Sequence, residues 1–342
     1  MKTPILETKR LLLRPLSLSD AKHIFKTWTS DPDVAKYMVW DLHESIDDTI
    51  NWLKVEVNAI DGDYNYTWGI VLKETNELFG TIGIYKKDNS DVFSLGYNIA
   101  KSYWNNGYTT EAGKTVLDFA TSKLNIKKFF CRHASKNIAS MKVMKKLGFV
   151  YFKDSSYESF SGKKHFESKD YFLDLNIKPP KLEDSKDIAR IITDCWKNNY
   201  RNILPEEFLN NLSYEDRKNR IRSSILGTNE KFTSDIIVYK DDTVKGAAFY
   251  GKNICNLPEN FGEIIVLYVD INEQRKGIGA KLINWVKNEL KNKGFTDMIL
   301  WCLKDNLPSI EFYKAMGGTI SQERDFEIDG KLYKEVGIMY NL

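Results

Sequence analysis

An internal repeat is the feature of this sequence that most constrains its fold, because matching motifs recur about 170 residues apart. The segment WNNGYT at residues 104–109 matches QRKGIG at residues 274–279, and their glycines lie 170 residues apart. The segments NIAS at 137–140 and NLPS at 306–309 lie 169 residues apart. A nearly constant spacing across separate motifs predicts two copies of one fold.

The length of the chain agrees with this, since 342 residues suit two domains better than one. The repeat places the copies at about residues 1–176 and 177–342. Between them lies no linker rich in glycine, serine or proline; residues 171–178 instead read as one strand that ends the first copy and begins the second. The sequence therefore predicts a rigid, packed internal pseudo-dimer rather than two tethered domains.

Within each copy the hydrophobic pattern alternates between strands and helices. Ile278, Leu282, Val286 and Leu290 recur every fourth residue and predict a helix that stops near Gly294. The expected strands are 93–99, 128–133, 235–239, 247–250, 263–270 and 298–303, and the expected helices are 109–123, 139–147, 278–290 and 308–316. This order predicts a mixed α/β fold in both copies.

Composition excludes several other classes of protein. Lys and Arg number 50 against 47 Asp and Glu, and a net charge of +3 does not suit a strongly basic nucleic-acid binder. The sequence has no apolar run of about 18 residues and no apolar segment near its first residue, which predicts a cytoplasmic protein without a membrane partner. No disulfide framework or metal site is expected from the spacing of Cys131, Cys195, Cys255, Cys302, His23, His43, His133 and His165.

The glycine turn at 274–279 lies between an expected strand and an expected helix. The first turn of a helix has free N–H groups and the positive end of the helix dipole, so it can bind phosphate. Gly277 and Gly279 lack Cβ atoms, which would let a pyrophosphate approach, although a plain connection could also use this turn. The Walker pattern is absent, and Leu282 occupies the third glycine position of a dinucleotide-binding pattern.

Two motifs in order carry a family resemblance. The QxxGxG turn at 274–279 is followed by NxxSxxFYxxxG at 306–317, and this pair resembles the acetyl-CoA-binding core of the GNAT superfamily of N-acetyltransferases. The first copy has YWxxGYxTEA at 103–112 and NxxSxxVMxKxGF at 137–149. With TKRLLLRP at 8–15, these resemble the branch that contains ribosomal-protein N-terminal acetyltransferases and some polyamine acetyltransferases.

The resemblance implies a fold and a reaction. Each copy would have a central twisted mixed sheet flanked by helices. The chain would transfer acetyl from acetyl-CoA to the amine of a small molecule or peptide by direct attack, without a metal. An alkyl amine has a pKa near 10.4, so it must first lose a proton, and both the thioester oxygen and the leaving thiolate need stabilisation.

For the second copy, the resemblance implies Glu263 as the base, acting directly or through water, and Tyr313 as the general acid at the coenzyme A sulfur. The residues that it implies for binding the cosubstrate are Leu267, Tyr268, Val269, Gln274, Arg275, Lys276, Gly277, Ile278, Gly279, Ala280, Asn306 and Ser309. Plainer interpretations stay open: Glu263 as a solvated strand end, Tyr313 as a core residue, and Asn306 with Ser309 as a helix cap.

The first copy departs from its branch. Met144 stands where the second copy has a tyrosine, so Ser140 is implied to serve the leaving thiolate. Ser94 replaces the glutamate usual before Leu-Gly-Tyr, so Asp91 or a water would have to act as base, while Glu111 is interpreted as structural. The implied cosubstrate-binding residues are Ile99, Trp104, Asn105, Asn106, Gly107, Tyr108, Thr109 and Asn137. We therefore expect the second copy to be the surer catalyst.

Two acidic segments with aromatic residues are candidate acceptor loops for a cationic amine, although a charge run is more often a solvated face. They comprise Trp40, Asp41, Glu44, Asp47, Asp48 and Trp52, and further on Glu323, Asp325, Glu327 and Asp329. Trp196 and Tyr200 could line the acceptor pocket or belong to the core. Two alternatives remain: one catalytic copy with a structural partner, and an acyl-CoA-binding sensor without catalysis.

Overall fold

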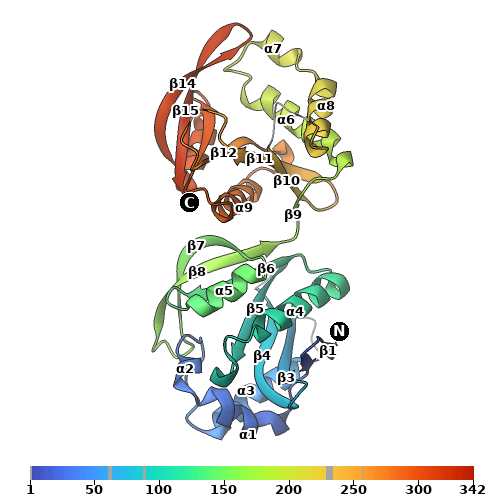
Figure 1. Ribbon diagram of the computed structural model, residues 1–342, viewed down its shortest axis with the longest axis vertical. Coiled ribbons are helices and arrows are strands. Elements are labelled where there is room, and N and C mark those ends of the chain that lie inside the picture. Colours follow the sequence, from blue (N-terminus) through green and yellow to red (C-terminus); the bar gives the residue numbers. More distant parts are fainter. Residues whose placement is uncertain (1, 61–63, 88–89, 229–233, 256) are drawn as a thin grey trace. The chain divides into compact units, whose positions relative to one another are not determined.

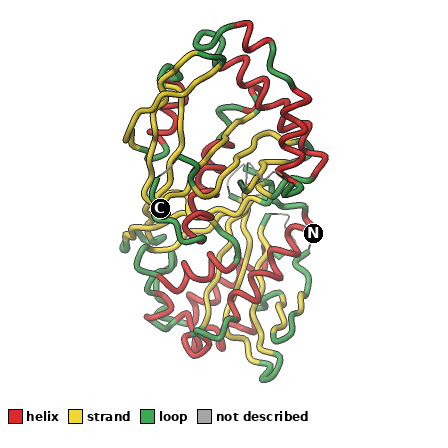
Figure 2. The backbone as a smooth tube through the Cα atoms, turned by 45° about the horizontal axis from the view of Figure 1, so that its top comes forward, coloured by secondary structure: helices red, strands yellow, loops and turns green. Residues whose placement is uncertain are grey.

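The computed structural model describes residues 2–60, 64–87, 90–228, 234–255 and 257–342, and the chain forms two compact units. They comprise Met1–Leu175 and Asn176–Leu342. Figures 1 and 2 show the strands of each unit joined in one sheet, with helices packed against it. Each sheet combines antiparallel pairs with a parallel pair, which confirms the expected mixed α/β fold.

In the described part of the first unit, the sheet has eight strands in the order β1-β2-β3-β4-β5-β6-β8-β7. The strands are β1 Leu6–Glu7, β2 Leu11–Arg14, β3 Asn65–Leu72, β4 Glu77–Lys86, β5 Val92–Ile99, β6 Lys128–Ala134, β7 Val150–Glu158 and β8 His165–Asp174. The helices are α1 Ala21–Ile24, α2 Pro32–Ala35, α3 Ile46–Ala59, α4 Tyr108–Leu124 and α5 Ile138–Lys146. Ala112, Val116 and Ala120 form the buried stripe of α4, and Asn125 ends this helix in a left-handed conformation.

The second unit has, in its described residues, a seven-stranded sheet in the order β14-β15-β13-β12-β11-β10-β9. The strands are β9 Ile177–Lys178, β10 Asp235–Lys240, β11 Val244–Lys252, β12 Phe261–Val269, β13 Asp297–Leu303, β14 Thr319–Ile328 and β15 Lys331–Asn341. The helices are α6 Ser185–Asn199, α7 Glu206–Asn210, α8 Tyr214–Ile225, α9 Ile278–Asn292 and α10 Leu307–Ala315. The strands and helices expected within each copy are therefore present, with ends displaced by a few residues.

Helices cover both faces of the second sheet. Val238 and Phe249 pack against α6 in one core cluster, and the strand alternation turns their neighbours to the opposite face. There Gly246 lies close to Ile278 and Leu282 of α9: a Cβ atom added to it would lie 3.2 Å from Ile278 and 3.3 Å from Leu282. We call these the α6 face and the α9 face of the second sheet.

The parallel pair in each sheet separates partway along its length. β12 pairs with β13 from Phe261 to Ile264, yet β12 continues to Val269. β5 pairs with β6 from Val92 to Ser94, and continues to Ile99. Each central strand therefore has an end segment that faces a gap between strands, which we call the splay.

The junction between the two units differs from the expected continuous strand. β8 ends at Asp174, a turn occupies 175–176, and β9 begins at Ile177. The Leu175 N–H donates to the Lys127 carbonyl in the first unit, whereas the Asn176 carbonyl accepts from Lys240 in the second. The strand breaks because its two halves pair with different sheets. Rigid packing of the two copies stays a prediction.

Candidate active site

The backbone of β12 presents free groups to the splay. The Asp270 N–H donates to the Lys245 carbonyl of β11 at 2.9 Å. Because successive backbone groups of a strand point to opposite sides, Leu267 and Val269 face away from β11, toward the splay. Tyr268, the third predicted residue of this strand, directs its backbone toward β11 instead. The geometry thus brings two of the three predicted amides to one side.

One side chain of each glycine turn donates a hydrogen bond to the last carbonyl of the central strand before it. Gln274 Nε2 donates to the Val269 carbonyl at 3.2 Å, and Trp104 Nε1 donates to the Ile99 carbonyl at 2.8 Å. Gln274 and Trp104 lie 170 residues apart and make the same contact in the two copies. Their side chains therefore shape the turn, while the backbone after them remains for a ligand.

The two glycine turns have the same backbone conformation. Asn105 and Arg275 have φ values of 64° and 63°, and Gly107 and Gly277 have 77° and 78°. Asn105 in the first copy thus has a counterpart in Arg275, because both copies place a side chain at this left-handed position. Asparagine is among the residues that tolerate this conformation best.

A helix begins directly after the glycine of each turn, and its first N–H groups make no hydrogen bonds within the helix. In α9 the first such bond runs from the Lys281 N–H to the Gly277 carbonyl at 3.1 Å, so the N–H groups of 278–280 precede it. A Cβ atom added to Gly277 would meet nothing within 4 Å, whereas one added to Gly279 would lie 3.1 Å from the Phe312 ring. Gly277 thus leaves open space for an anion, and Gly279 serves close packing.

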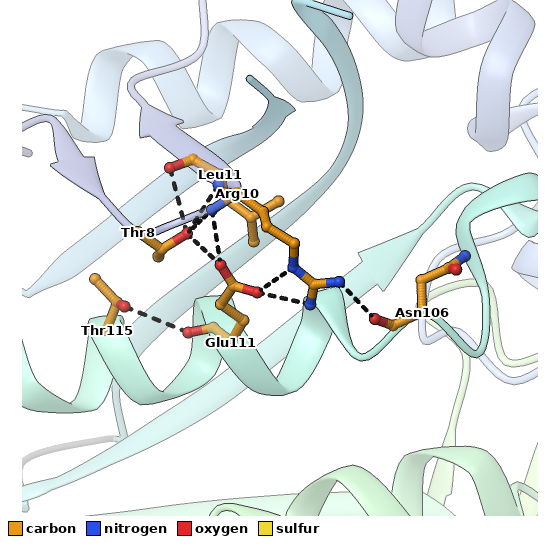
Figure 3. Close-up of polar contacts among 6 residues, drawn as sticks. All are labelled: Thr8, Arg10, Leu11, Asn106, Glu111 and Thr115. Atoms are coloured by element: carbon orange, nitrogen blue, oxygen red, sulfur yellow. Dashed lines mark hydrogen bonds and ion pairs between the residues drawn. The ribbon is translucent and has the colours of Figure 1, made fainter. Parts of the chain in front are cut away.

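The corresponding turn of the first copy is fastened to the N-terminal segment (Figure 3). Glu111 Oε1 accepts from Thr8 Oγ1 at 2.5 Å and from the Arg10 N–H at 3.1 Å. Glu111 Oε2 accepts from Arg10 Nε at 2.7 Å, and Arg10 Nη1 donates to the Asn106 carbonyl at 3.2 Å. These contacts fit the structural interpretation of Glu111, which joins the start of α4 to the residues before β2.

Replacing Glu111 with Gln should destabilise the first domain by about 1–2 kcal/mol, because a charge-assisted contact to Arg10 is lost. Burial acts to raise the pKa of Glu111, but hydrogen bonds from Thr8 and Arg10 outweigh it and lower this pKa. The stabilisation is therefore present above the ordinary glutamate pKa and is lost as pH falls through the lowered value. Urea unfolding at several pH values measures it. The exposed Asp118→Asn on the same helix is the control, and an equal effect there would contradict the prediction.

A β-bulge decides where Glu263 points. Phe249 pairs with Val266 and Tyr250 pairs with Ile264, so Ile265 is an extra residue in β12. Without it, Glu263 and Tyr268 would lie on opposite faces, since they are five residues apart. With it, Glu263 shares the α6 face with Tyr268.

The Glu263 side chain is buried, with 3% of its surface exposed. It accepts from the Ile254 N–H at 2.8 Å and from Cys255 Sγ at 3.4 Å. Burial raises the pKa of this carboxyl, partly opposed by those hydrogen bonds and by Arg324. A solvated strand end is therefore the wrong interpretation of Glu263. Sequence reasoning missed Cys255 and Arg324, whose Nη1 donates to Cys255 Sγ at 2.8 Å, because they are distant from the family motifs.

Tyr313 belongs to a group of aromatic hydroxyls on the same face. The Tyr200 and Tyr268 hydroxyls lie 3.4 Å apart, and the Tyr200 ring meets Trp196 edge-on at 5.2 Å. Burial, with contributions from Cys302 and Tyr200, raises the pKa of Tyr313 well above its ordinary value. Tyr313 is therefore protonated at neutral pH and can only donate a proton or a hydrogen bond.

Asn306 caps the start of α10, as the plainer interpretation of this residue expected. Its Oδ1 accepts from the Ser309 N–H at 3.4 Å, and Asn137 caps α5 in the same way through the Ser140 N–H at 3.2 Å. Asn306 also interacts with the Tyr200 hydroxyl. Its side chain thus connects the cap of α10 to the group of aromatic hydroxyls.

The first copy has a different arrangement at the corresponding places. Gly80 pairs with Ile99 and, five residues on, Tyr85 pairs with Ser94, in a register without a bulge. Gly251 and Glu263 occupy the same relative places in the second copy, so Ser94 stands where the second copy has its buried carboxyl. Asp91 is exposed at the start of β5 and forms an ion pair with Lys128 at 2.7 Å, away from the splay end of the strand.

Ser140 of the first copy is brought together with a residue that sequence reasoning missed. The Tyr97 hydroxyl lies 2.9 Å from Ser140 Oγ. Burial raises the pKa of Tyr97 well above its ordinary value, so this hydroxyl remains protonated. Tyr97 belongs to the Leu-Gly-Tyr motif, which was the available signal. Met144 is buried in the core of this unit.

The two acidic segments are largely engaged in local contacts rather than directed at a ligand. Asp48 caps α3 through the Ser45 N–H at 2.9 Å, and Asp41 lies 3.7 Å from Lys164. The later segment lies on β14 and its turn rather than in a loop, and its Glu323 and Asp325 pair with Lys304 and Lys334. The aromatic residues of the earlier segment line a small pocket formed by Trp28, Thr29, Trp40, His43, Trp52 and Asn98.

Within the described ranges, no cluster of three or more His, Cys, Asp or Glu side chains is placed to hold a metal ion. In the same part of the chain, no helix has both the length and the apolar character needed to cross a membrane.

Comparisons with known proteins agree with this geometry. The model of the acetyltransferase (GNAT) domain matches residues 10–150, and that of the acetyltransferase (GNAT) family matches residues 187–317. The N-acetyltransferase YuaI of Bacillus subtilis is 32% identical over 48% of this chain and 91% of its own length, and YoaA of the same species is 31% identical over 43% and 82%. A solved GNAT acetyltransferase from Bacillus anthracis shows 23% identity, 50% and 99% coverage, and a TM-score of 0.45.

The family models and the relatives together place this protein among the acetyltransferases. The chain belongs to the GNAT family and carries two GNAT domains in tandem. GNAT acetyltransferases use acetyl-CoA, and each domain presents a turn and a helix start that suit its pyrophosphate.

Proposed function

We propose that this chain transfers acetyl from acetyl-CoA to an amine by direct attack, with the second domain as the principal catalyst. The observation that carries the proposal is the buried Glu263 carboxyl, which the bulge places on the same face as Tyr268 at the splay. The first domain has Ser94 at this place and lacks an equivalent carboxyl there.

Glu263 is proposed as the base. Glu263 lies opposite Gly251 and Leu267 lies opposite Ala248, which separates them by three residues of β11, or about 10 Å. This distance is too long for direct proton transfer, so we assign the transfer to intervening water. A raised pKa suits the task, because it brings the carboxyl closer to the working pH while the amine surrenders its proton.

Groups at the splay and on α10 would carry out the attack on the thioester and the release of the thiolate. The amine nitrogen attacks the thioester carbon, the new C–N bond forms, and the amine proton passes through water to Glu263. The Leu267 amide would hold the developing oxyanion, a contact worth about 3–4 kcal/mol in comparable sites. As the C–S bond breaks, Tyr313, which its raised pKa keeps protonated, would donate its proton to the thiolate and regain one from water.

Acetyl-CoA supplies the activated acetyl group, and the residues of the two turns are proposed to hold it. In the second domain the amides of Ile278, Gly279 and Ala280 would receive the pyrophosphate, with Arg275 and Lys276 nearby. In the first domain Tyr108 and Thr109 take this place, and Ser140 with Tyr97 would face the sulfur.

A calorimetric titration of the full chain with acetyl-CoA tests this function. Two sites would support two working domains, whereas one site would support a structural first domain. The release of coenzyme A with a panel of amines then separates an enzyme from a non-catalytic sensor. Absence of binding at both sites would overturn the proposal.

Replacing Tyr313 with Phe should lower kcat about 10- to 100-fold while KM for acetyl-CoA changes little, because the ring stays and only the proton donor is lost. The effect should shrink with an acyl donor whose thiol has a lower pKa, since such a thiolate needs no proton. Tyr333→Phe, on β15 of the same domain, is the matched control. Equal losses with both donors would argue against Tyr313 as the acid.

A further inference from the structure

Arg217 on α8 has no carboxylate partner among the described residues. Its Nη1 is buried and has no hydrogen bond, and no carboxylate of the described chain pairs with it. The other arginines that are not exposed, Arg14, Arg132 and Arg324, each have a carboxylate within 2.8 Å. Arg217 is thus the exception among the shielded arginines in the described ranges.

An unpaired charge in this position is costly for the free protein. Burial lowers the pKa of Arg217, with Arg220 acting in the same direction and Tyr268 opposing. Guanidinium remains charged despite such shifts, so this partly buried cation lies beside the Trp196 ring and has no carboxylate to neutralise it among the described residues. Because this charge destabilises the free protein, a bound ligand is the natural explanation for its presence.

The location of Arg217 connects it to the proposed acetyl-transfer site. Its guanidinium carbon lies 5.4 Å from the Trp196 ring centre, and Trp196 meets Tyr200. The Tyr200 hydroxyl lies 3.4 Å from that of Tyr268, which stands on the α6 face of β12 beside the splay. A chain of contacts thus runs from the free cation to the strand that would hold the thioester.

We propose that the acceptor of the second domain is an amino acid or a similar amino carboxylic acid, whose carboxylate pairs with Arg217 while its amine is acetylated. This inference rests on the proposed function. One guanidinium beside neutral hydroxyls matches a single negative charge, and a phosphate would call for more cations. A polyamine does not suit this site, because Arg217 repels cations and the acidic residues Glu323 and Asp325 are already paired.

The test uses the full chain loaded with coenzyme A and calorimetric titrations of matched probes. The pairs are L-phenylalanine with 2-phenylethylamine, L-lysine with cadaverine, and O-phosphoethanolamine with ethanolamine. We expect an amino acid to bind more tightly than its carboxylate-free partner. In Arg217→Gln this preference should fall about 30-fold or more, and Arg217→Lys should retain part of it. Arg222→Gln, an exposed residue of the same helix, should leave it unchanged.

A structural role for Arg217 makes the opposite prediction for stability. Arg217→Gln should melt at a higher temperature than the wild type, because it removes a partly buried charge that has no carboxylate partner among the described residues, and loss of folding would contradict the proposal. Three results would overturn the proposal. The wild type could show no preference for the carboxylate, Arg217→Gln could keep the preference, or only the phosphate pair could show one. Failure of acetyl-CoA binding in the separate titration would instead overturn the proposed function.

Discussion

Replacing Glu263 with Gln should lower kcat/KM for acetyl transfer about 10²- to 10⁴-fold, the largest loss that we expect from a single side chain. Gln keeps the shape of Glu and can still accept the Ile254 N–H, but it cannot take a proton. The affinity for acetyl-CoA should stay the same, because Glu263 lies away from the turn that would hold the pyrophosphate. Steady-state rates and calorimetric binding of acetyl-CoA, measured together, separate these two effects.

The pH dependence gives a second readout. Burial raises the pKa of Glu263, so the wild-type rate should decline on the acid side at a pH above the ordinary glutamate range, and this limb should vanish in the Gln variant. Because the folded pKa is raised, the carboxyl contributes stability below its unfolded pKa and loses it as pH rises through the folded pKa. Glu263→Gln should therefore be the more stable protein at neutral pH. Glu259→Gln, an exposed residue paired with Lys252, is the control; a similar rate loss there would rule out a specific role.

Replacing Gly277 with Asp should weaken acetyl-CoA binding at the second domain about 100-fold or more. The new carboxylate would accept hydrogen bonds from the first amides of α9 and repel the phosphates that they would otherwise bind. The fold should tolerate the change, because a Cβ at Gly277 meets nothing within 4 Å and Asp is among the residues that accept a φ near 78°. Binding should thus fall while the domain stays folded, which a folding defect cannot produce.

Three matched variants sharpen this result. Gly277→Asn has the same shape without the charge and should weaken binding much less. Gly330→Asp places the same residue at another open glycine with positive φ, far along the chain from the turn, and should leave binding unchanged. Gly107→Asp applies the change to the first domain, so the two variants assign each calorimetric site to one domain. Unaltered affinity in Gly277→Asp would remove the turn from the binding site.

Much of the fold was predictable because its signals are local. The every-fourth-residue pattern of α9 and the glycine at each turn depend on neighbours in sequence, and both were predicted correctly. Glu263 was singled out only through family resemblance, because neither its burial nor its face follows from its neighbours. The bulge at Ile265 depends on pairing with β11, which no local pattern encodes.

The unpredicted parts of the site all depend on distant contacts. Tyr97 meets Ser140 from 43 residues away, and Cys255 meets Arg324 from 69 residues away. The supposed strand at 171–178 breaks for the same reason, since a run of apolar residues does not reveal that its ends pair in different sheets. Arg217 is conspicuous only once the carboxylates of the described residues have been located.

Because of the extra residue at Ile265, the number of residues in β12 decides which face of the sheet Glu263 occupies. Deleting a single residue there would rotate every upstream side chain of the strand by half a turn, sending Glu263 to the α9 face and an aliphatic neighbour to the α6 face, while the glycine turn downstream stayed in register. Insertions and deletions are thus as potent as substitutions in this segment. Two copies of one fold can consequently acquire or lose acid–base chemistry through strand length alone, with every motif residue retained.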